Sequence, residues 1–414
     1  MSGLSCLEKL LDGVEVEWTE LGEIAKIKHG KDWKNLESGA VPVYGSGGVM
    51  GYVNKYSYDK PTVLIPRKGT ITNIFYVDIP FWNVDTIYYT DIATSKIIPK
   101  YFYHFMKSLN LMALDTGSGR PSLTQAILNK LLIPIPCPDN PEKSLAIQSE
   151  IVRILDAFTA LTNELTNELK LRKQQYNYYR EQLLSFDDGS TKFAYLEKLL
   201  DGAEVEWKVL GDVAKKIYSG GTPDTKKTEY WEGGTFPWMS SGEVNLKTVK
   251  ETEKYITEAG LNNSSAKLVP KNSVVMALAG QGKTRGKVAR TRIALTTNQS
   301  LAALTFDEKK INSDYIFYFL ETQYESLRQI SSGNSGRGGL NLQMISAYKV
   351  PVPCPNNPEK SLAIQSEIVR ILDKFDTLTN SISEGLPREI ELRKKQYEHY
   401  RNLLFSFPKP VADN

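Results

Sequence analysis

The chain contains two blocks of sequence that each occur twice. The sixteen residues of Pro141–Asp156 recur without a change at Pro358–Asp373, and Leu7–Trp18 recurs at Leu196–Trp207 with a single substitution. Solenoid proteins stack many repeats of about 20–50 residues, whereas two copies of roughly 200 residues fit a pseudo-dimer better. The repeats therefore predict one frame that is built twice, with pseudo-twofold symmetry.

The displacement between matching blocks changes along the chain. The short block is displaced by 189 residues, the long block by 217, and Leu171-Arg172-Lys173, which returns at Leu392-Arg393-Lys394, by 221. The insert 208–350 is thus 28 residues longer than the unrelated insert 19–133, and the second copy carries four more residues between about 164 and 389. Because the order of blocks repeats as in a circle, we expect the two chain ends to lie close together.

The composition is that of an ordinary soluble protein. The chain has 414 residues, of which 41% are hydrophobic and 24% charged, and its net charge is +3. This length predicts two to three domains. The chain has no run of 18 apolar residues and no N-terminal signal pattern, so we expect neither a membrane span nor secretion. Three scattered cysteines favour a reducing cytoplasm, and the small net charge leaves any nucleic-acid contact to local patches.

Each long block opens a long amphipathic helix. The segment from Ser144 to Phe186 contains no Gly or Pro, which predicts a helix of 43 residues, about 65 Å long, with Ser144 as a reasonable N-cap. Its apolar residues follow the spacing of a coiled-coil seam. In the first copy these are Ile147, Ile151, Ile154, Phe158, Leu161, Leu165 and, after a stutter, Leu169; in the second they are Ile364, Ile368, Ile371, Phe375, Leu378 and Ile382.

One such helix cannot bury its stripe alone. The two helices are therefore predicted to form an antiparallel coiled coil; the alternative is that each packs on its own insert. Gly385-Leu386-Pro387 predicts a break or kink near 385–387 in the second helix. In the first helix the unit Thr162–Leu165 is duplicated as Thr166–Leu169, which adds about one turn, roughly 6 Å. Such a unit can change the separation of two heads without altering either.

The inserts combine short β-rich runs, glycine-rich turns and aromatic helical stretches. The fold class is therefore α+β, with two mixed globular domains separated by the two long helices. Each insert ends in Pro-x-Pro-Cys-Pro, which we interpret as a rigid strand-to-helix connector with a structural cysteine. The predicted layout is an N-terminal segment (1–18), a first globular domain (19–143), a central helix (144–186), a linker repeating the N-terminal segment (187–207), a second globular domain (208–360), a C-terminal helix (361–407) and a tail (408–414).

Polar residues on glycine-rich loops are the candidate binding residues of both inserts. Arg, Lys, Asn, Gln and Ser side chains on such loops hydrogen-bond base edges and phosphates. The alternative for any one loop is a solvated turn. In the first insert the candidates are Tyr44, Ser46, Arg67, Lys68, Thr70, Asn73, Ser118, Arg120 and Ser122; in the second they are Ser240, Ser241, Gln281, Lys283, Thr284, Arg285, Lys287, Asn334 and Arg337.

No catalytic constellation can be assembled from the sequence. The three histidines His29, His104 and His399 are scattered, so no metal cluster is expected, and His104, in an aromatic run, is expected to pack. Gly280–Lys287 lacks the spacing of a P-loop, and no nuclease or amino-methyltransferase motif is present. We expect no chemistry from this chain alone.

The repeated blocks resemble those of specificity subunits of type I restriction–modification enzymes. The resemblance covers the whole chain and is most specific for the IC subfamily. It rests on the two LEKLLDGVEVEW-like segments, the two NPEKSLAIQSEIVRILD blocks, the tandem TNEL unit and Leu378–Pro408. It is weak in the inserts, as the family implies, because the inserts are its target recognition domains.

The resemblance implies a non-catalytic reader of DNA sequence. Each insert would bind one half of a bipartite, asymmetric target in double-stranded DNA, and the paired helices would set the gap between the halves. The frame would bind two modification subunits, which hold S-adenosylmethionine and methylate adenine, and two ATP- and Mg-dependent restriction subunits. The chain itself would hold no cofactor. Two copies of the four-residue unit imply the shorter of the gaps known for this subfamily.

Two other functions remain open from the residues alone. One is a stand-alone DNA-modifying enzyme, against which the missing catalytic residues count. The other is a coiled-coil adaptor that binds only proteins, which would leave the polar loops of both inserts unexplained.

Overall fold

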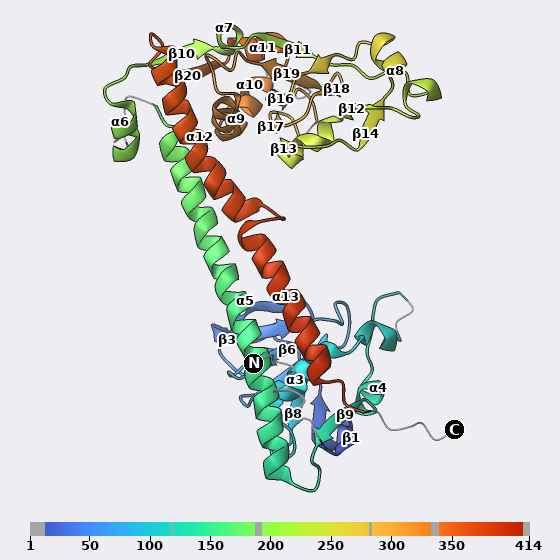
Figure 1. The fold of residues 1–414 in the computed structure, drawn as a ribbon. Helices are drawn as coiled ribbons and strands as arrows, with labels where there is room; N and C mark the ends of the chain where they lie inside the picture. Colours follow the sequence, from blue (N-terminus) through green and yellow to red (C-terminus); the bar gives the residue numbers. More distant parts are fainter. Residues whose placement is uncertain (1–12, 117–118, 187–192, 281–283, 333–338, 409–414) are drawn as a thin grey trace. The chain divides into compact units, whose positions relative to one another are not determined.

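The computed structural model describes residues 13–116, 119–186, 193–280, 284–332 and 339–408 (Figure 1). It divides into a first unit, Met1–Glu168 with Arg388–Asn414, and a second unit, Leu169–Pro387. Each unit thus joins one insert to parts of both long helices. The predicted proximity of the chain ends is confirmed for the described residues, because Trp18 Nε1 donates to the Pro408 carbonyl oxygen at 2.7 Å.

The first insert folds into two small sheets with short helices, and α3 packs on one of the sheets. One sheet has the order β2-β8-β5-β6, the other β4-β3-β7, and α3 packs on β5 and β6. The strands are β2 Ala25–Lys28, β3 Ser38–Gly45, β4 Gly48–Val53, β5 Thr62–Pro66, β6 Phe75–Val77, β7 Trp82–Asn83 and β8 Ile87–Ile92. The helices are α2 Leu21–Ile24, α3 Pro99–Ser108, η1 Leu111–Leu114 and α4 Gln125–Asn129.

The second unit has a larger version of the same arrangement. Its sheets have the orders β11-β19-β16-β17-β13 and β14-β12-β18-β15, and α9 packs on β16 and β17. The strands are β11 Lys216–Ser219, β12 Phe236–Met239, β13 Thr248–Val249, β14 Lys254–Ile256, β15 Leu268–Val269, β16 Val274–Ala277, β17 Val288–Thr291, β18 Leu295–Thr297 and β19 Leu301–Thr305. The helices are α6 Ala194–Leu200, α7 Leu210–Val213, η2 Thr228–Tyr230, η3 Ser241–Leu246, α8 Glu258–Asn262, α9 Ser313–Thr322, α10 Tyr324–Ser332 and α11 Leu342–Ala347. The α+β class is confirmed.

The repeated short block forms a strand in each unit, and that strand pairs with the proline-rich exit of the insert. β1 (Val16–Glu20) is antiparallel to β9 (Leu132–Pro136), and β10 (Val205–Val209) is antiparallel to β20 (Lys349–Pro353). The exits are therefore strands, and not only connectors as predicted. Proline is tolerated because each strand lies in a two-stranded sheet, where one edge needs no ladder partner.

The cysteine that follows each exit strand turns the chain toward the long helix. Cys137 and Cys354 adopt the left-handed region, with φ of 47° and 48°. Their amides donate to the carbonyl oxygens of Glu15 and Glu204, both at 2.8 Å. Matching geometry at matching positions supports the structural role predicted for both cysteines.

The first long helix, α5 (Pro141–Leu183), is continuous over 43 residues but begins and ends three residues earlier than predicted. Ser144 is not its cap. The Asn140 carboxamide oxygen accepts from the Lys143 amide at 3.0 Å, while Ser144 is buried and its hydroxyl accepts from Gln148 Nε2 at 3.1 Å. Proline at the first helical position needs no amide partner, which explains the earlier start.

The second long helix is interrupted, as predicted. α12 (Pro358–Asn380) and α13 (Gly385–Leu404) are separated by residues 381–384, just before the predicted segment. Pro387 lies in the first turn of α13, where proline is tolerated. Gly385 has φ +74°, and a Cβ atom there would lie 2.4 Å from the Thr377 carbonyl oxygen. The interruption lies in the stretch where the second copy carries four more residues than the first.

Within each unit, α5 packs along one part of the interrupted helix (Figure 1). In the first unit Phe158 of α5 stacks on Tyr400 of α13, with ring centroids 5.0 Å apart. In the second unit Phe375 of α12 stacks on Tyr179 of α5, at 5.4 Å. These pairs are equivalent by the sequence repeat.

The first turns of each long helix pack on their own insert instead of forming the seam. Ile147, Ile151 and Leu155 join the core of the first unit, and their equivalents Ile364, Ile368 and Leu372 join that of the second. Each long helix therefore packs on its own insert in its first turns and on the other long helix farther along. Of the remaining seam residues, Ile154, Ile371, Leu165, Leu169 and Leu378 are half-buried, Leu161 is 37% exposed and Ile382 is 83% exposed.

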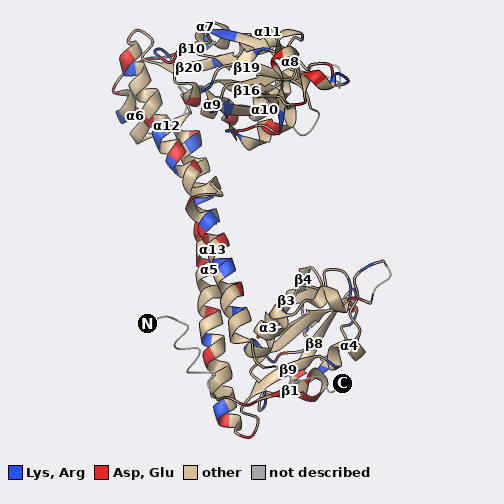
Figure 2. Cartoon of the chain, turned by 45° about the vertical axis from the view of Figure 1, so that its right-hand side comes forward, with Lys and Arg blue, Asp and Glu red and all other residues tan. Residues whose placement is uncertain are grey.

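Charged residues of both signs cover the outer faces of the long helices (Figure 2). The repeat places Glu150–Arg153 and Glu367–Arg370 pairs at the same position, each with a 2.6 Å contact. The hydrogen bond from Arg370 is the main reason that the pKa of Glu367 falls to about 2. Such exposed pairs add only a few tenths of a kcal/mol each. Across the described residues, none of the helices combines the length and apolarity that crossing a membrane requires.

Candidate nucleic-acid interface

Three of the predicted polar loops of the first insert come together in the structure. The Asn73 carboxamide donates to the Ser46 carbonyl oxygen at 3.2 Å, which joins the β3–β4 turn to the loop after β5. That loop is also joined to the 120–123 segment, because the Gly69 amide donates to Pro121 O and Lys68 forms a β-bridge with Ser122. We call Ser46, Arg67–Asn73 and Arg120–Ser122 the first loop cluster.

The cations of the first loop cluster face solvent. Lys68, Thr70 and Arg120 are exposed, and Arg67 is half-buried with one guanidinium nitrogen 3.4 Å from the Asp85 carbonyl oxygen. Tyr44 is placed differently. Its ring packs against Phe75 and Phe81, and burial raises its pKa, which is typical of a structural tyrosine. Ser118 lies outside the described residues.

In the second insert several predicted hydroxyls are used inside the fold. The Ser240 side chain caps η3 in a capping box with Glu243, and Ser241 begins that helix. Thr284 is 7% exposed and donates to the Ala279 carbonyl oxygen at 3.1 Å. These hydroxyls stabilise turns. Gln281, Lys283, Asn334 and Arg337 lie outside the described residues, and Arg285 is half-buried.

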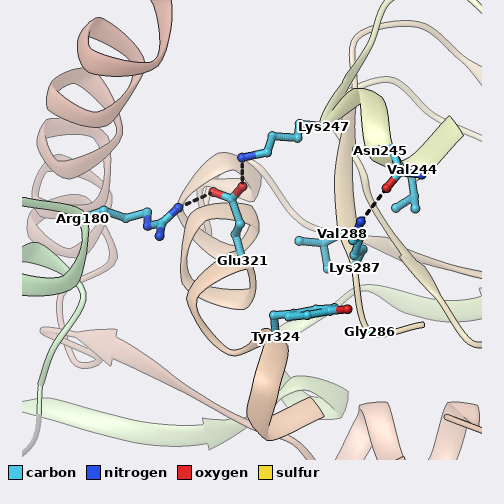
Figure 3. Close-up of a pocket in the computed structure, with 9 residues that line it drawn as sticks. All are labelled: Arg180, Val244, Asn245, Lys247, Gly286, Lys287, Val288, Glu321 and Tyr324. Atoms are coloured by element: carbon cyan, nitrogen blue, oxygen red, sulfur yellow. Dashed lines mark hydrogen bonds and ion pairs between the residues drawn. The ribbon is translucent and has the colours of Figure 1, made fainter. Parts of the chain in front are cut away.

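Lys287 belongs to a pocket of about 270 Å³ in the second unit (Figure 3). Its ammonium donates to the Asn245 side-chain oxygen at 2.7 Å, which joins the 284–287 loop to η3. Glu321, from α9, accepts from Arg180 at 3.4 Å and also pairs with Lys247. Three cations and one carboxylate leave this pocket net positive, as a phosphate-contacting surface requires.

Sequence reasoning missed Arg180, Lys247 and Glu321. A signal was available for Arg180, since its equivalent in the second copy is Arg401. Both guanidinium groups lie over a tyrosine ring one helical turn earlier, Tyr176 and Tyr397, at 5.5 and 5.4 Å. Nothing in the sequence marks Lys247 or Glu321, because their pairing depends on the tertiary fold.

The aspartate that ends each long repeated block binds the insert helix of its own unit. Asp156 accepts from His104 Nε2 at 2.9 Å and pairs with Lys100 at 2.6 Å. His104 also contacts the Tyr397 hydroxyl at 2.9 Å, so it joins α3, α5 and α13 and does more than pack. Burial lowers the pKa of His104, although Asp156 opposes the shift. Burial alone would raise the pKa of Asp156, but its two hydrogen bonds lower it.

In the second unit the equivalent aspartate, Asp373, binds different partners. Asp373 accepts from the Tyr318 hydroxyl at 2.6 Å and from Arg290 at 2.7 Å. Tyr318 occupies the position in α9 that His104 occupies in α3. Arg290 is 8% exposed; burial opposes its charge, but Tyr318, Asp314 and Asp373 outweigh burial and raise its pKa. The repeated frame thus attaches two different inserts through one aspartate.

Replacing His104 by the tyrosine of the other unit should remove a pH dependence of stability. Because the folded-state pKa of His104 is lowered, the unfolded chain binds the proton more readily, and the unfolding free energy should fall as the pH drops below about 6.5. His104→Tyr should abolish that fall, measured as urea midpoints at pH 7.5 and pH 5.5. The exposed His399, changed to Gln, serves as the control and should keep the wild-type slope. An unchanged slope in His104→Tyr would refute the assignment.

The fold defines the class: a strand-and-helix frame, present twice, that carries two different α+β domains. Within the described residues there is no group of three or more His, Cys, Asp or Glu placed to hold a metal ion. The family model of the type I restriction modification DNA specificity domain matches residues 13–172 and 203–392. The chain belongs to this family.

Known relatives match the chain from end to end. A type I restriction enzyme specificity subunit of Escherichia coli is 43% identical over 427 residues, which cover 99% of each chain. A putative type I restriction enzyme specificity subunit of Haemophilus influenzae is 32% identical and covers 97% of this chain and 98% of its own. The crystal structure of the type I restriction–modification S subunit from M. genitalium shares the fold, with a TM-score of 0.61 at 16% identity over 97% of this chain and 98% of that one.

Proposed function

We propose that this chain reads a bipartite DNA sequence for a type I restriction–modification enzyme and has no catalytic role of its own. The observation that carries the proposal is the duplicated frame, which holds two unrelated inserts through equivalent contacts. The first unit presents the cationic first loop cluster, and the second unit presents the net-positive pocket around Lys287. Two unlike basic surfaces on one repeated frame fit two unlike half-sites.

The partners follow from the family. We propose that the frame binds two modification subunits, that two restriction subunits join them, and that S-adenosylmethionine, ATP and Mg belong to those partners. The duplicated frame supports a count of two, because each copy offers equivalent contacts. The cytoplasm is the proposed location, where the DNA lies. We also propose residues 19–143 and 208–360 as the two target recognition domains.

Half-site-specific loss of binding tests the proposal. Exchanging Arg67 and Lys68 for Ala should weaken binding of one half-site about thirtyfold, since each removed phosphate or base contact costs about 1 kcal/mol. Lys287→Ala should weaken binding of the other half-site. The measurement is competition for duplexes in which one half-site at a time is scrambled.

The outcomes separate the three candidate functions. Loss shared equally by both half-sites would indicate generic phosphate contact and contradict the assignment to separate readers. Absence of any duplex binding, with or without modification subunits, would favour a protein-only adaptor. Methyl transfer by this chain alone, supplied with S-adenosylmethionine and DNA, would establish an enzyme instead.

A further inference from the structure

The β3–β4 hairpin of the first unit ends in exposed apolar side chains. Val49, Met50 and Tyr52 are 48%, 57% and 57% exposed. The strands pair up to Gly45 and Gly48, so the turn itself is Ser46-Gly47. Exposed apolar residues are common singly, but a cluster at one hairpin tip is typical of an interaction site.

The backbone of the hairpin is shaped around these side chains. Val49 pairs with Tyr44 and Gly51 with Val43, so Met50 is the extra residue of a β-bulge, a feature that re-aims a side chain. A Cβ atom on Gly45 would lie 2.4 Å from the Met50 sulfur, so glycine leaves the space that Met50 occupies. The Met50 side chain therefore lies against Gly45 near the turn.

The hairpin tip adjoins the cations of the first loop cluster. Thr86 connects them, because its hydroxyl accepts from the Ser46 amide at 3.4 Å and its carbonyl oxygen accepts from the Arg67 amide at 2.8 Å. A Cβ atom on Gly69, next to Lys68, would lie 3.3 Å from the Ser46 hydroxyl. Among the described residues no carboxylate forms an ion pair with Arg67 or Lys68. An apolar tip beside unpaired cations is complementary to a DNA groove, where phosphates flank the bases.

We propose that Met50, supported by Val49, packs on the 5-methyl group of a thymine in the half-site read by the first unit. The major groove admits a two-stranded β-ribbon, and the thymine methyl is the apolar group that the bases display there. The proposal rests on the proposed function, because it requires the first unit to read DNA. Beyond that function, the proposal names the group on the DNA bases, the thymine methyl, that the apolar hairpin tip recognises.

A double-mutant cycle between protein and DNA tests the contact. Uracil lacks only the methyl group of thymine, and a half-site that is methylated on adenine contains a thymine opposite that adenine. Replacing the thymines of the first half-site by uracil should weaken binding of the full chain, with its modification subunits, by about fourfold per contacted methyl. Met50→Ala should weaken binding to thymine DNA by a similar factor and be insensitive to uracil.

The control variants distinguish loss of the Met50 contact from a general loss of DNA binding. Met50→Leu, which retains an apolar contact, should restore sensitivity to uracil, and Leu268→Ala, which changes a similarly exposed apolar residue of the second unit, should keep the wild-type response. A Met50→Ala protein that is as sensitive to uracil as wild type would overturn the proposal, because the substitution would then weaken binding to thymine DNA and to uracil DNA equally. If the wild-type complex showed no preference for its half-sites, the proposed function itself would fail.

Discussion

Deletion of Thr166–Leu169 should shorten the gap between the two DNA half-sites by about one to two base pairs and leave both half-sequences unchanged. The deleted unit is identical to Thr162–Leu165, so the helix remains continuous. It becomes about 6 Å shorter and turns by only about 40°, while B-DNA rises roughly 3.4 Å per base pair. Methylome sequencing of cells that carry the complete system would read the gap directly.

A substitution that preserves length is the matched control. Thr166→Ala removes the 2.7 Å hydrogen bond from its hydroxyl to the Thr162 carbonyl oxygen but keeps the number of residues. It should leave the gap as it is. A deletion variant with the original gap, or with a new half-sequence, would contradict the idea that α5 sets the spacing.

Asp373→Ala should destabilise the second unit by roughly 3 kcal/mol. It leaves the Arg290 guanidinium buried, with Asp314 at 3.7 Å as its remaining carboxylate. Removing one partner of a buried ion pair costs about 3–5 kcal/mol, and the lower end applies because Asp373 is itself 39% exposed and Asp314 compensates in part. Because the chain has two units, amide hydrogen exchange of each unit is the appropriate measurement.

The repeat supplies the control for this prediction as well. Asp156→Ala changes the equivalent residue of the first unit, where Lys100 is 40% exposed and His104 can be neutral. No charge becomes stranded there, so its cost should be clearly smaller. Equal losses in the two units would show that the frame, and not the partner in the insert, determines the contribution of this aspartate.

Much of the frame was predictable because it depends on local pattern. The apolar spacing predicts α5, and Gly385-Leu386-Pro387 predicts an interruption close to the one observed. The pattern could not predict that Ile147 and Ile151 face the insert while Phe158 faces the paired helix. An apolar stripe defines a face of a helix, but the partner of that face is decided by tertiary packing.

The candidate site was less predictable than the frame. Glycine-rich loops located the first loop cluster and Lys287, since such loops stay at the surface. They also produced Ser240 and Thr284, whose hydroxyls stabilise their own turns. Ser and Thr occur in loops both as ligand contacts and as local caps, and sequence alone does not separate these uses.

The interruption at residues 381–384 gives the molecule a tolerance for length change. α5 is one continuous helix, whereas its companion is two shorter helices separated by four non-helical residues. We therefore expect that a turn added to or removed from α5 needs no matching change in the companion, because non-helical residues can adopt a new conformation more easily than a helix. Variation in target spacing can then arise from a single slippage event within one short tandem of codons.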